Sequence, residues 1–278
     1  MEAKKRVIIE ASKGIPKLHL RELLQYKDLF LLLAYRDYRV RYAQTFLGLA
    51  WVVVQPLFTL LIFALVFGHA FHIDTGNVPY PLFAMCGMSA WTYFAFILNQ
   101  SGNAIIGAQH IIQKIYFPRL IIPFSKVAVG MIDFLVTLVF IAVLLFIYAI
   151  KPSHHLVFLP VFVVLTVVSA LGMGLWLSAI TVRYRDFQHV VPFLVQLGLY
   201  ISPVAYPAEV VTQSLPEWAT AIYFLNPVAG IVEGFRWAIL GTGALHVFTY
   251  ISFGITAFIF VSGLYFFKKT ERLMADLI

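Results

Sequence analysis

Asp133 and Lys126 are the charged residues of one long apolar stretch, and they lie seven residues apart. On an α-helix this spacing places both on one face, roughly 10.5 Å apart along the axis. A lysine near a helix end can extend its amine to water, whereas a carboxylate in the middle needs a partner or a cavity. Asp133 is therefore either a proton relay or an acceptor that holds two helices together. Because it is an isolated acid, the second interpretation is favoured.

Glu233 and Arg236 form a second candidate pair, since residues three apart on a helix are neighbours. They lie in the apolar stretch 218–240, which Asn226 and Pro227 interrupt. Two charges and a helix break make a poor membrane span. The stretch therefore predicts two short helices that enter the membrane from one side and return. Irregular backbone at that depth must be buried in protein or line a watery cavity.

Other reactive chemistry is missing from the sequence. There is no phosphate-binding Gly-x-x-x-x-Gly-Lys-Ser/Thr loop, no His-Glu-x-x-His motif and no Gly-x-Ser-x-Gly motif. The single cysteine, Cys86, excludes an intrachain disulfide and a multi-cysteine metal cluster. The adjacent His154 and His155 point apart on a helix. We therefore expect no metal, no cofactor and no enzymatic reaction in this chain.

Composition identifies the elements that carry these residues. Of the 278 residues, 61% are apolar and 12% are charged, which a soluble domain could not keep out of water. A helix needs about 20 apolar residues to cross the hydrocarbon core. The segments are continuously apolar rather than alternating, so the predicted fold is an all-α polytopic membrane protein. Its six predicted transmembrane helices are 46–68, 82–106, 121–150, 156–182, 187–207 and 245–267.

Basic residues orient these spans. With six spans, 18 of the 20 Lys and Arg residues fall on the side that holds both termini. The positive-inside rule makes that side the cytoplasm. A seventh span at 218–240 would put the basic residues 268–272 outside. The same distribution explains the net charge of +7 without nucleic acid as a partner.

Before the first span, residues 18–34 predict a helix with leucines on one side and charges on the other side of its first half. Such an amphipathic helix lies in the membrane interface. A simple anchor explains it as well as a docking element does.

Four motifs extend the interpretation beyond composition. They are Gln113-Lys-Ile-Tyr-Phe-Pro-Arg-Leu-Ile-Ile-Pro123, Val182-Arg-Tyr-Arg-Asp-Phe-Gln-His-Val-Val-Pro192, Ser202-Pro-Val-Ala-Tyr-Pro207 and Asn226-Pro-Val-Ala-Gly-Ile-Val-Glu-Gly-Phe-Arg236. In this order, and with six spans, the set resembles the transmembrane subunit of ABC-2 type polysaccharide exporters. The resemblance runs from about residue 36 to the end. It divides the chain into a cytoplasmic segment, 1–45, and an ABC-2 type transmembrane domain, 46–278.

The resemblance implies the partners. It implies a homodimer in the bacterial cytoplasmic (inner) membrane, with two copies of a separate P-loop subunit that binds ATP and Mg²⁺. In such exporters, short cytoplasmic helices transmit closure of the ATPases, and a rigid helix can carry such a movement. The matching pieces here are 18–34 and a loop helix at 107–119. The coupling residues implied are Leu24, Ile111, Ile112, Lys114 and Tyr116.

The resemblance also implies an exit gate and a substrate. The short helices at 216–240 match the gate, with Asn226, Pro227, Glu233 and Arg236, although the spacing of Glu233 and Arg236 slightly favours a purely structural pair. The substrate is a glycan linked to a polyprenyl diphosphate. Arginine's planar fork matches phosphate oxygens, and Arg36, Arg39 and Arg41 precede the first span. The resemblance points most at Arg41; anchoring to anionic membrane lipid explains the other two equally well.

Other functions stay open on the sequence alone. A teichoic-acid or capsule exporter permease belongs to the same class. An ion-driven secondary transporter usually has internal repeats and several intramembrane acids, and this sequence has no repeat and one such acid. An enzyme acting on lipid-linked sugars needs paired acid and base groups or metal ligands near one interface, and the sequence provides none.

Overall fold

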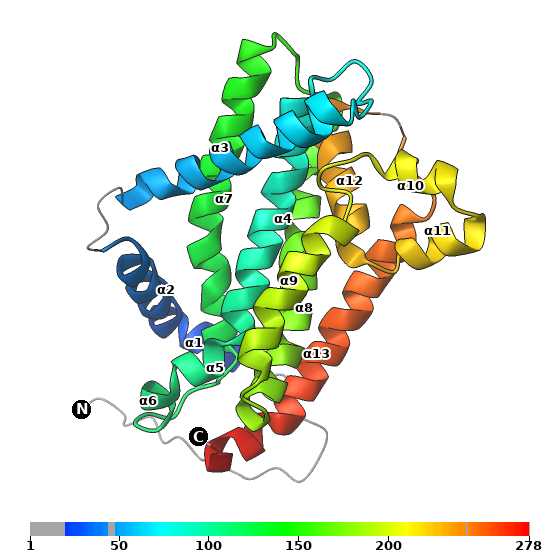
Figure 1. Cartoon of the computed structure of the whole chain (residues 1–278). Helices are drawn as coiled ribbons and strands as arrows, with labels where there is room; N and C mark the ends of the chain where they lie inside the picture. Colours follow the sequence, from blue (N-terminus) through cyan, green and yellow to red (C-terminus); the bar gives the residue numbers. More distant parts are fainter. Residues whose placement is uncertain (1–19, 44–47, 243, 278) are drawn as a thin grey trace.

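The computed structural model describes residues 20–43, 48–242 and 244–277, and every regular element within these ranges is helical (Figure 1). This confirms the all-α prediction for the described part of the chain. The start of the predicted helix 18–34 lies outside the described residues.

Five segments of the described chain are long and apolar enough to cross a membrane. They correspond to five of the six predicted spans, with ends shifted by a few residues. The segments are α3 with η2 (Trp51–Phe63, Ala64–Ala70), α4 (Tyr80–Gly102), α7 (Ile121–Ile147), η3 with α8 (His154–Phe158, Leu159–Arg183) and α13 (Thr249–Leu277).

The predicted span 187–207 is shorter in the structure. It forms α9, Phe187–Ile201, which has 15 residues and is below the length of a full span. The helix ends there because Pro203 follows, and a residue before proline is disfavoured in the helical region. Ser202 is accordingly extended, with ψ of 149°.

The predicted stretch 218–240 contains two short helices, as expected, and a further short helix precedes them. They are α10 (Ala208–Ser214), α11 (Glu217–Tyr223) and α12 (Pro227–Leu240). The break expected at Asn226 and Pro227 begins α12. The Asn226 side chain accepts a hydrogen bond from the Val228 amide at 3.1 Å, and Pro227 occupies the first turn. Proline is favoured there because its missing N–H has no helical partner anyway.

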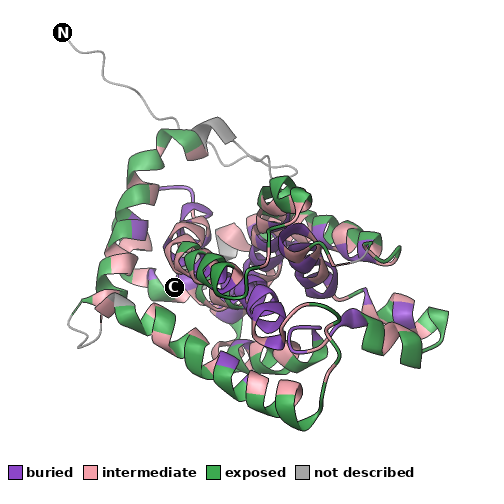
Figure 2. Cartoon of the chain, turned by 90° about the horizontal axis from the view of Figure 1, so that it is seen from above, coloured by how far each residue is buried: buried purple, intermediate pink, exposed green. Residues whose placement is uncertain are grey.

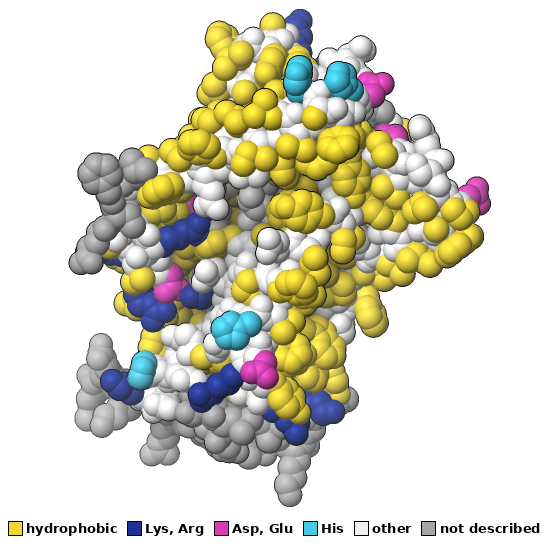
Figure 3. Space-filling model, viewed as in Figure 1, with side chains coloured by type: hydrophobic (Ala, Val, Ile, Leu, Met, Phe, Trp, Pro, Cys, Tyr) yellow, Lys and Arg dark blue, Asp and Glu magenta, His cyan; other side chains and the backbone are white. Residues whose placement is uncertain are grey.

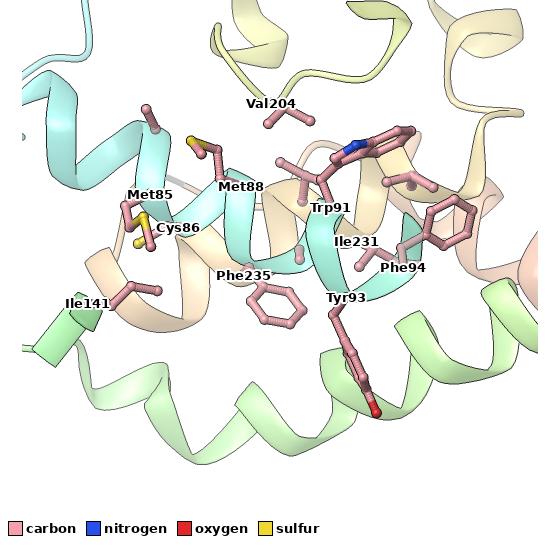
Figure 4. Close-up of a cluster of buried hydrophobic side chains, with 14 of the residues drawn as sticks. Met85, Cys86, Met88, Trp91, Tyr93, Phe94, Ile141, Val204, Ile231 and Phe235 are labelled. Carbon is pink, nitrogen blue, oxygen red and sulfur yellow. The ribbon is translucent and has the colours of Figure 1, made fainter. Parts of the chain in front are cut away.

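Helix α4 forms the centre of the bundle. It packs against α7, α8 and α12. In its most apolar stretch of 18 residues, 78% of the residues are buried. Figure 4 shows Trp91 and Tyr93 leaving α4 in different directions, with Phe235 of α12 beside them. Buried residues fill the interior and exposed ones surround it (Figure 2). By contrast, only 11% of the residues in the corresponding stretch of α3 and η2 are buried, so this segment exposes apolar surface to lipid or to another chain.

Small residues of α8 allow close contact with α13 and α4. A Cβ atom on Gly172 would lie 2.7 Å from the Phe260 Cα atom. Gly174 allows the same approach toward α4, where its Cβ would lie 2.6 Å from the Ser101 Cβ atom. Ser178 is fully buried.

The N-terminal helix differs from its prediction. It consists of α1 (Leu20–Gln25) and α2 (Lys27–Tyr42), so it breaks at Tyr26 and continues beyond residue 34. Leu33 and Ala34 are buried, whereas Leu24 is 73% exposed. The predicted apolar face is therefore wrong in detail, because Leu33 packs into a buried cluster with residues of α7, α8 and α13.

The predicted loop helix at 107–119 is also wrong as a single element. The chain forms two single turns, α5 (Ala104–Gly107) and α6 (Gln109–Ile112), and is then non-helical until α7 begins. Pro118 interrupts that part because proline lacks the amide donor. A short 3₁₀ turn, η1 (Gly48–Ala50), precedes α3. In Figure 1, α5 and α6 lie at the lower end of the molecule with α1 and the end of α13, and Figure 3 shows most of the visible Lys and Arg side chains toward that end.

Candidate functional site

Two reciprocal ion pairs join α2 to α7. The Arg41 Nη2 atom of α2 lies 2.7 Å from the Asp133 Oδ2 atom of α7. Asp37 of α2 pairs with Lys126 of α7. Each helix thus contributes one acid and one base, so the two pairs fix how α2 lies along α7. Sliding α2 would bring like charges together, which is unfavourable.

Asp133 is held by a second partner. The Tyr42 hydroxyl donates a hydrogen bond to the Asp133 Oδ1 atom. Burial raises the pKa of the Tyr42 phenol, and this hydrogen bond to Asp133 raises it further, so the phenol stays protonated and remains a donor. Both carboxylate oxygens are therefore occupied. The favoured prediction, an acceptor that holds two helices, is confirmed.

A cavity of about 530 Å³ opens beside this cluster. Arg41, Tyr42 and Asp133 line it, together with parts of α3, α4 and α7. Its aromatic lining consists of Tyr42, Trp51, Trp91, Tyr93, Phe96 and Phe134, and its neutral polar lining includes Gln55, Thr59, Thr92, Asn99 and Thr137. The cavity combines a cation, flat aromatic faces and hydrogen-bonding groups, which suits a ligand with both anionic and sugar-like parts.

The structure separates the three arginines that the sequence groups together. Arg41 lines the cavity and lies over the Phe96 ring, with 4.4 Å between the guanidinium carbon and the ring centroid. Arg39 instead lies over Tyr35, and Arg36 pairs with its neighbour Asp37. Neither of these two lines the cavity. Of these three arginines, Arg41 alone therefore lines the cavity.

Arg236 is the centre of a second cluster, and its predicted pair with Glu233 is confirmed at 2.9 Å. The side chain is fully buried. It donates to the carbonyls of Val204 at 2.6 Å and Tyr206 at 3.2 Å, and it lies 3.6 Å from the Phe83 ring centroid. Arg236 thereby joins α12 to α4 and to the connection 202–207.

The sequence did not predict these carbonyl contacts. Gly87 of α4 is a sequence feature that these contacts require, because a Cβ atom there would lie 2.7 Å from the Arg236 Nη2 atom. A glycine in a helix indicates close approach only when its neighbour is known.

The proposed coupling residues differ in how far they are buried. Leu24 and Tyr116 are exposed, while Ile111 and Ile112 pack in part against the cluster that contains Leu33. A pocket of about 270 Å³ is lined by residues 112–117 and 119, which include Lys114.

The loop before α7 is tied to the end of α13, a contact that the sequence did not predict. The Arg119 Nη1 atom donates to the Glu271 carbonyl at 2.6 Å, and the Arg119 amide donates to the Glu271 carboxylate at 3.2 Å. This loop is therefore connected to α7 by the chain itself and to α13 through Arg119.

The helical bundle and its sequence define the class of this protein. A profile of the ABC-2 type transporter family matches residues 28–240, so the chain belongs to that family. Members of the family are membrane subunits of transporters rather than enzymes.

Three individual relatives show which members of the family this chain is similar to. The chain is 29% identical over 217 residues to the O-antigen export system permease protein RfbA of Myxococcus xanthus, covering 78% of this chain and 82% of the relative. It is 29% identical over 254 residues to a protein of the same name from Klebsiella pneumoniae, covering 90% and 95%. It is 24% identical over 213 residues to the polysialic acid transport protein KpsM of Escherichia coli, covering 74% and 78%.

Proposed function

We propose that this chain is the channel-forming permease of an ATP-driven exporter that moves polyprenyl-diphosphate-linked polysaccharide across the bacterial inner membrane. The similarity to O-antigen export permeases over 90% of the chain carries this proposal. The aromatic cavity with Arg41 supports it, because aromatic faces suit sugar rings and a guanidinium suits phosphate oxygens.

Substitutions at Arg41 test the headgroup contact. Arg41→Lys keeps the charge but loses the bidentate geometry, so it is expected to weaken export and substrate-stimulated ATP hydrolysis. Arg41→Ala is expected to weaken both more, by about tenfold or more, since charge-assisted hydrogen bonds contribute about 1.5–3 kcal/mol. Expression and orientation are checked for both variants. Full activity in a correctly inserted Arg41→Ala protein would remove Arg41 from the site, and full rescue by lysine would indicate lipid anchoring instead.

We propose a partner arrangement of two permeases and two P-loop subunits that bind ATP and Mg²⁺. The permease family and the thinly covered α3 and η2 segment, which leaves room for a second copy, support this assembly. The loop from α6 to α7 is the proposed ATPase contact, together with exposed residues of α1.

A substitution in that loop tests coupling. Ile112→Pro or Lys114→Glu is expected to release or uncouple the ATPase while leaving the permease in the membrane, because this end lies outside the candidate spans. Co-purification and export measure the effect. Lys151→Glu, in the exposed connection between α7 and η3, is a matched charge-reversal control distant from the loop in the chain. A normal complex with normal export in both loop variants would exclude this loop as the coupling element.

We propose six crossings with both termini in the cytoplasm, where α9 and the connection after it complete the fifth crossing. The short helices α10 to α12 then lie on the exit side as a gate, with Glu233 and Arg236 holding α12 to its neighbours. The basic residues gathered at one end of the molecule support this orientation.

Cysteine labelling tests the orientation. The native Cys86 is buried, so an added cysteine reports on its own position. A cysteine at Met274 is expected to resist an impermeant thiol reagent in intact cells, and one at the exposed Asn77 is expected to react. Labelling at position 274 from outside would contradict the six-crossing arrangement.

A capsule exporter permease is the second candidate, favoured by the match to KpsM over 74% of the chain. The two candidates differ in the glycan and share the mechanism proposed here. Purified complex tested with each class of lipid-linked glycan would distinguish them.

A further inference from the structure

Arg41 faces the cavity already paired with an acid. Asp133 Oδ2 lies 2.7 Å from Arg41 Nη2, and the other carboxylate oxygen accepts from Tyr42. Among the described residues that line the cavity, Arg41 and Asp133 are the charged side chains. Their charges cancel, so the cavity has no net side-chain charge and does not attract anions in general.

This neutrality matters because of the surrounding membrane. Anionic phospholipids are abundant at the cytoplasmic surface, and they attract basic residues that lie there. The Arg41 side chain is 38% exposed, so a headgroup could reach it. A phospholipid with one negative charge has the same charge as the Asp133 carboxylate, which is already placed and hydrogen-bonded. It therefore gains little by displacing that carboxylate. A diphosphate has more charge and more acceptor oxygens, so it competes better.

We propose that Asp133 is a specificity-determining residue: it reserves Arg41 for a polyanionic diphosphate headgroup by competing against the monoanionic headgroups of ordinary lipids. The inference rests on the proposed function, which supplies the diphosphate. It adds a selection step that positive charge alone cannot provide.

The rest of the α2–α7 interface provides an internal comparison. Asp37 and Lys126 form the second ion pair between the same two helices, with side chains only 17% and 12% exposed. Neither residue lines the cavity. If Asp133 served only to hold α2 on α7, removing its charge would have the same kind of effect as removing that of Asp37.

The experiment measures binding of geranylgeranyl diphosphate to the permease–ATPase complex in vesicles. One set of vesicles is phosphatidylcholine, and in the other part of it is replaced by phosphatidylglycerol. The ratio of the two dissociation constants is compared between wild type, Asp133→Asn and Asp37→Asn. Repulsion of the probe by the anionic surface is common to all variants, so it cancels in this comparison. Geranylgeraniol controls for partition of the isoprenyl chain.

Asp133→Asn is expected to bind the diphosphate more tightly in phosphatidylcholine and to lose that affinity in phosphatidylglycerol. The ratio should exceed the wild-type ratio by about tenfold, equivalent to about 1.4 kcal/mol. Asp37→Asn should match wild type. Tyr42→Phe keeps the acid but removes its hydrogen bond, so a smaller shift in the same direction is expected if Asp133→Asn is poorly folded.

Two results would overturn the inference. An unchanged ratio in Asp133→Asn and Tyr42→Phe, with diphosphate binding still reduced by Arg41→Ala, would make Asp133 a purely structural contact and leave the proposed function intact. Wild-type diphosphate binding by Arg41→Ala would remove the headgroup site itself, and with it this inference.

Discussion

Arg236→Ala is expected to destabilise the folded permease by about 3–5 kcal/mol, because it leaves an uncompensated buried charge. Glu233 loses its partner at 2.9 Å, and the carbonyls of Val204 and Tyr206 lose their donor. The connection 202–207 should then detach from α4 and α12. The thermal stability of the purified permease in detergent measures the loss.

Lys268→Ala provides the matched control. Lys268 and Glu271 also form an ion pair three residues apart on one helix, but both side chains are partly exposed, at 18% and 20%. Water reaches both ends of this pair, whereas the Arg236 side chain is fully buried, so Lys268→Ala is expected to cost less than Arg236→Ala. Adding Glu233→Gln to Arg236→Ala should restore part of the stability, since it removes the unpaired charge. Equal stability of Arg236→Ala and Lys268→Ala would contradict the role given to Arg236.

Gly172→Ala is expected to destabilise the permease by about 1–3 kcal/mol, because overpacking forces a shift of well-packed groups. The new methyl group would meet backbone atoms of Phe260, at 2.7 Å from Cα and 2.8 Å from N. Backbone cannot rotate away as a flexible side chain can, so α8 and α13 must separate. Unfolding of the purified protein by heat or denaturant measures the change.

Gly254→Ala is the control within the same helix pair. No atom lies within 4 Å of a Cβ placed there, so alanine meets open space and should gain up to about 1 kcal/mol of helix propensity. If the two alanine variants had the same stability, the close α8–α13 contact would not contribute as described.

Asp133 illustrates what the sequence could and could not predict. An acid within an apolar stretch requires a partner, and that requirement follows from the cost of burying charge. The identity of the partners did not follow, because Tyr42 lies 91 residues away in the chain. Their meeting depends on how α2 lies across α7, which is a property of the assembled bundle.

The helices likewise have features that the sequence predicts and features that depend on the folded bundle. The break at Asn226 and Pro227 was predictable because capping and proline chemistry are local. The buried face of α2 was not, since Leu33 is buried by residues from several distant segments. Sequence periodicity identifies an apolar stripe but does not say whether lipid or protein covers it. For this reason the predicted apolar face of the N-terminal helix differs from the face that is buried in the structure.

The most direct test is to purify the permease with its proposed P-loop ATPase partner and reconstitute both in vesicles. ATP hydrolysis and transfer of a lipid-linked glycan into the lumen are then measured. The account predicts that the glycan stimulates hydrolysis, and that transfer requires both subunits and ATP. Glycan transfer by the permease alone under an ion gradient, or hydrolysis that no lipid-linked glycan stimulates, would contradict it.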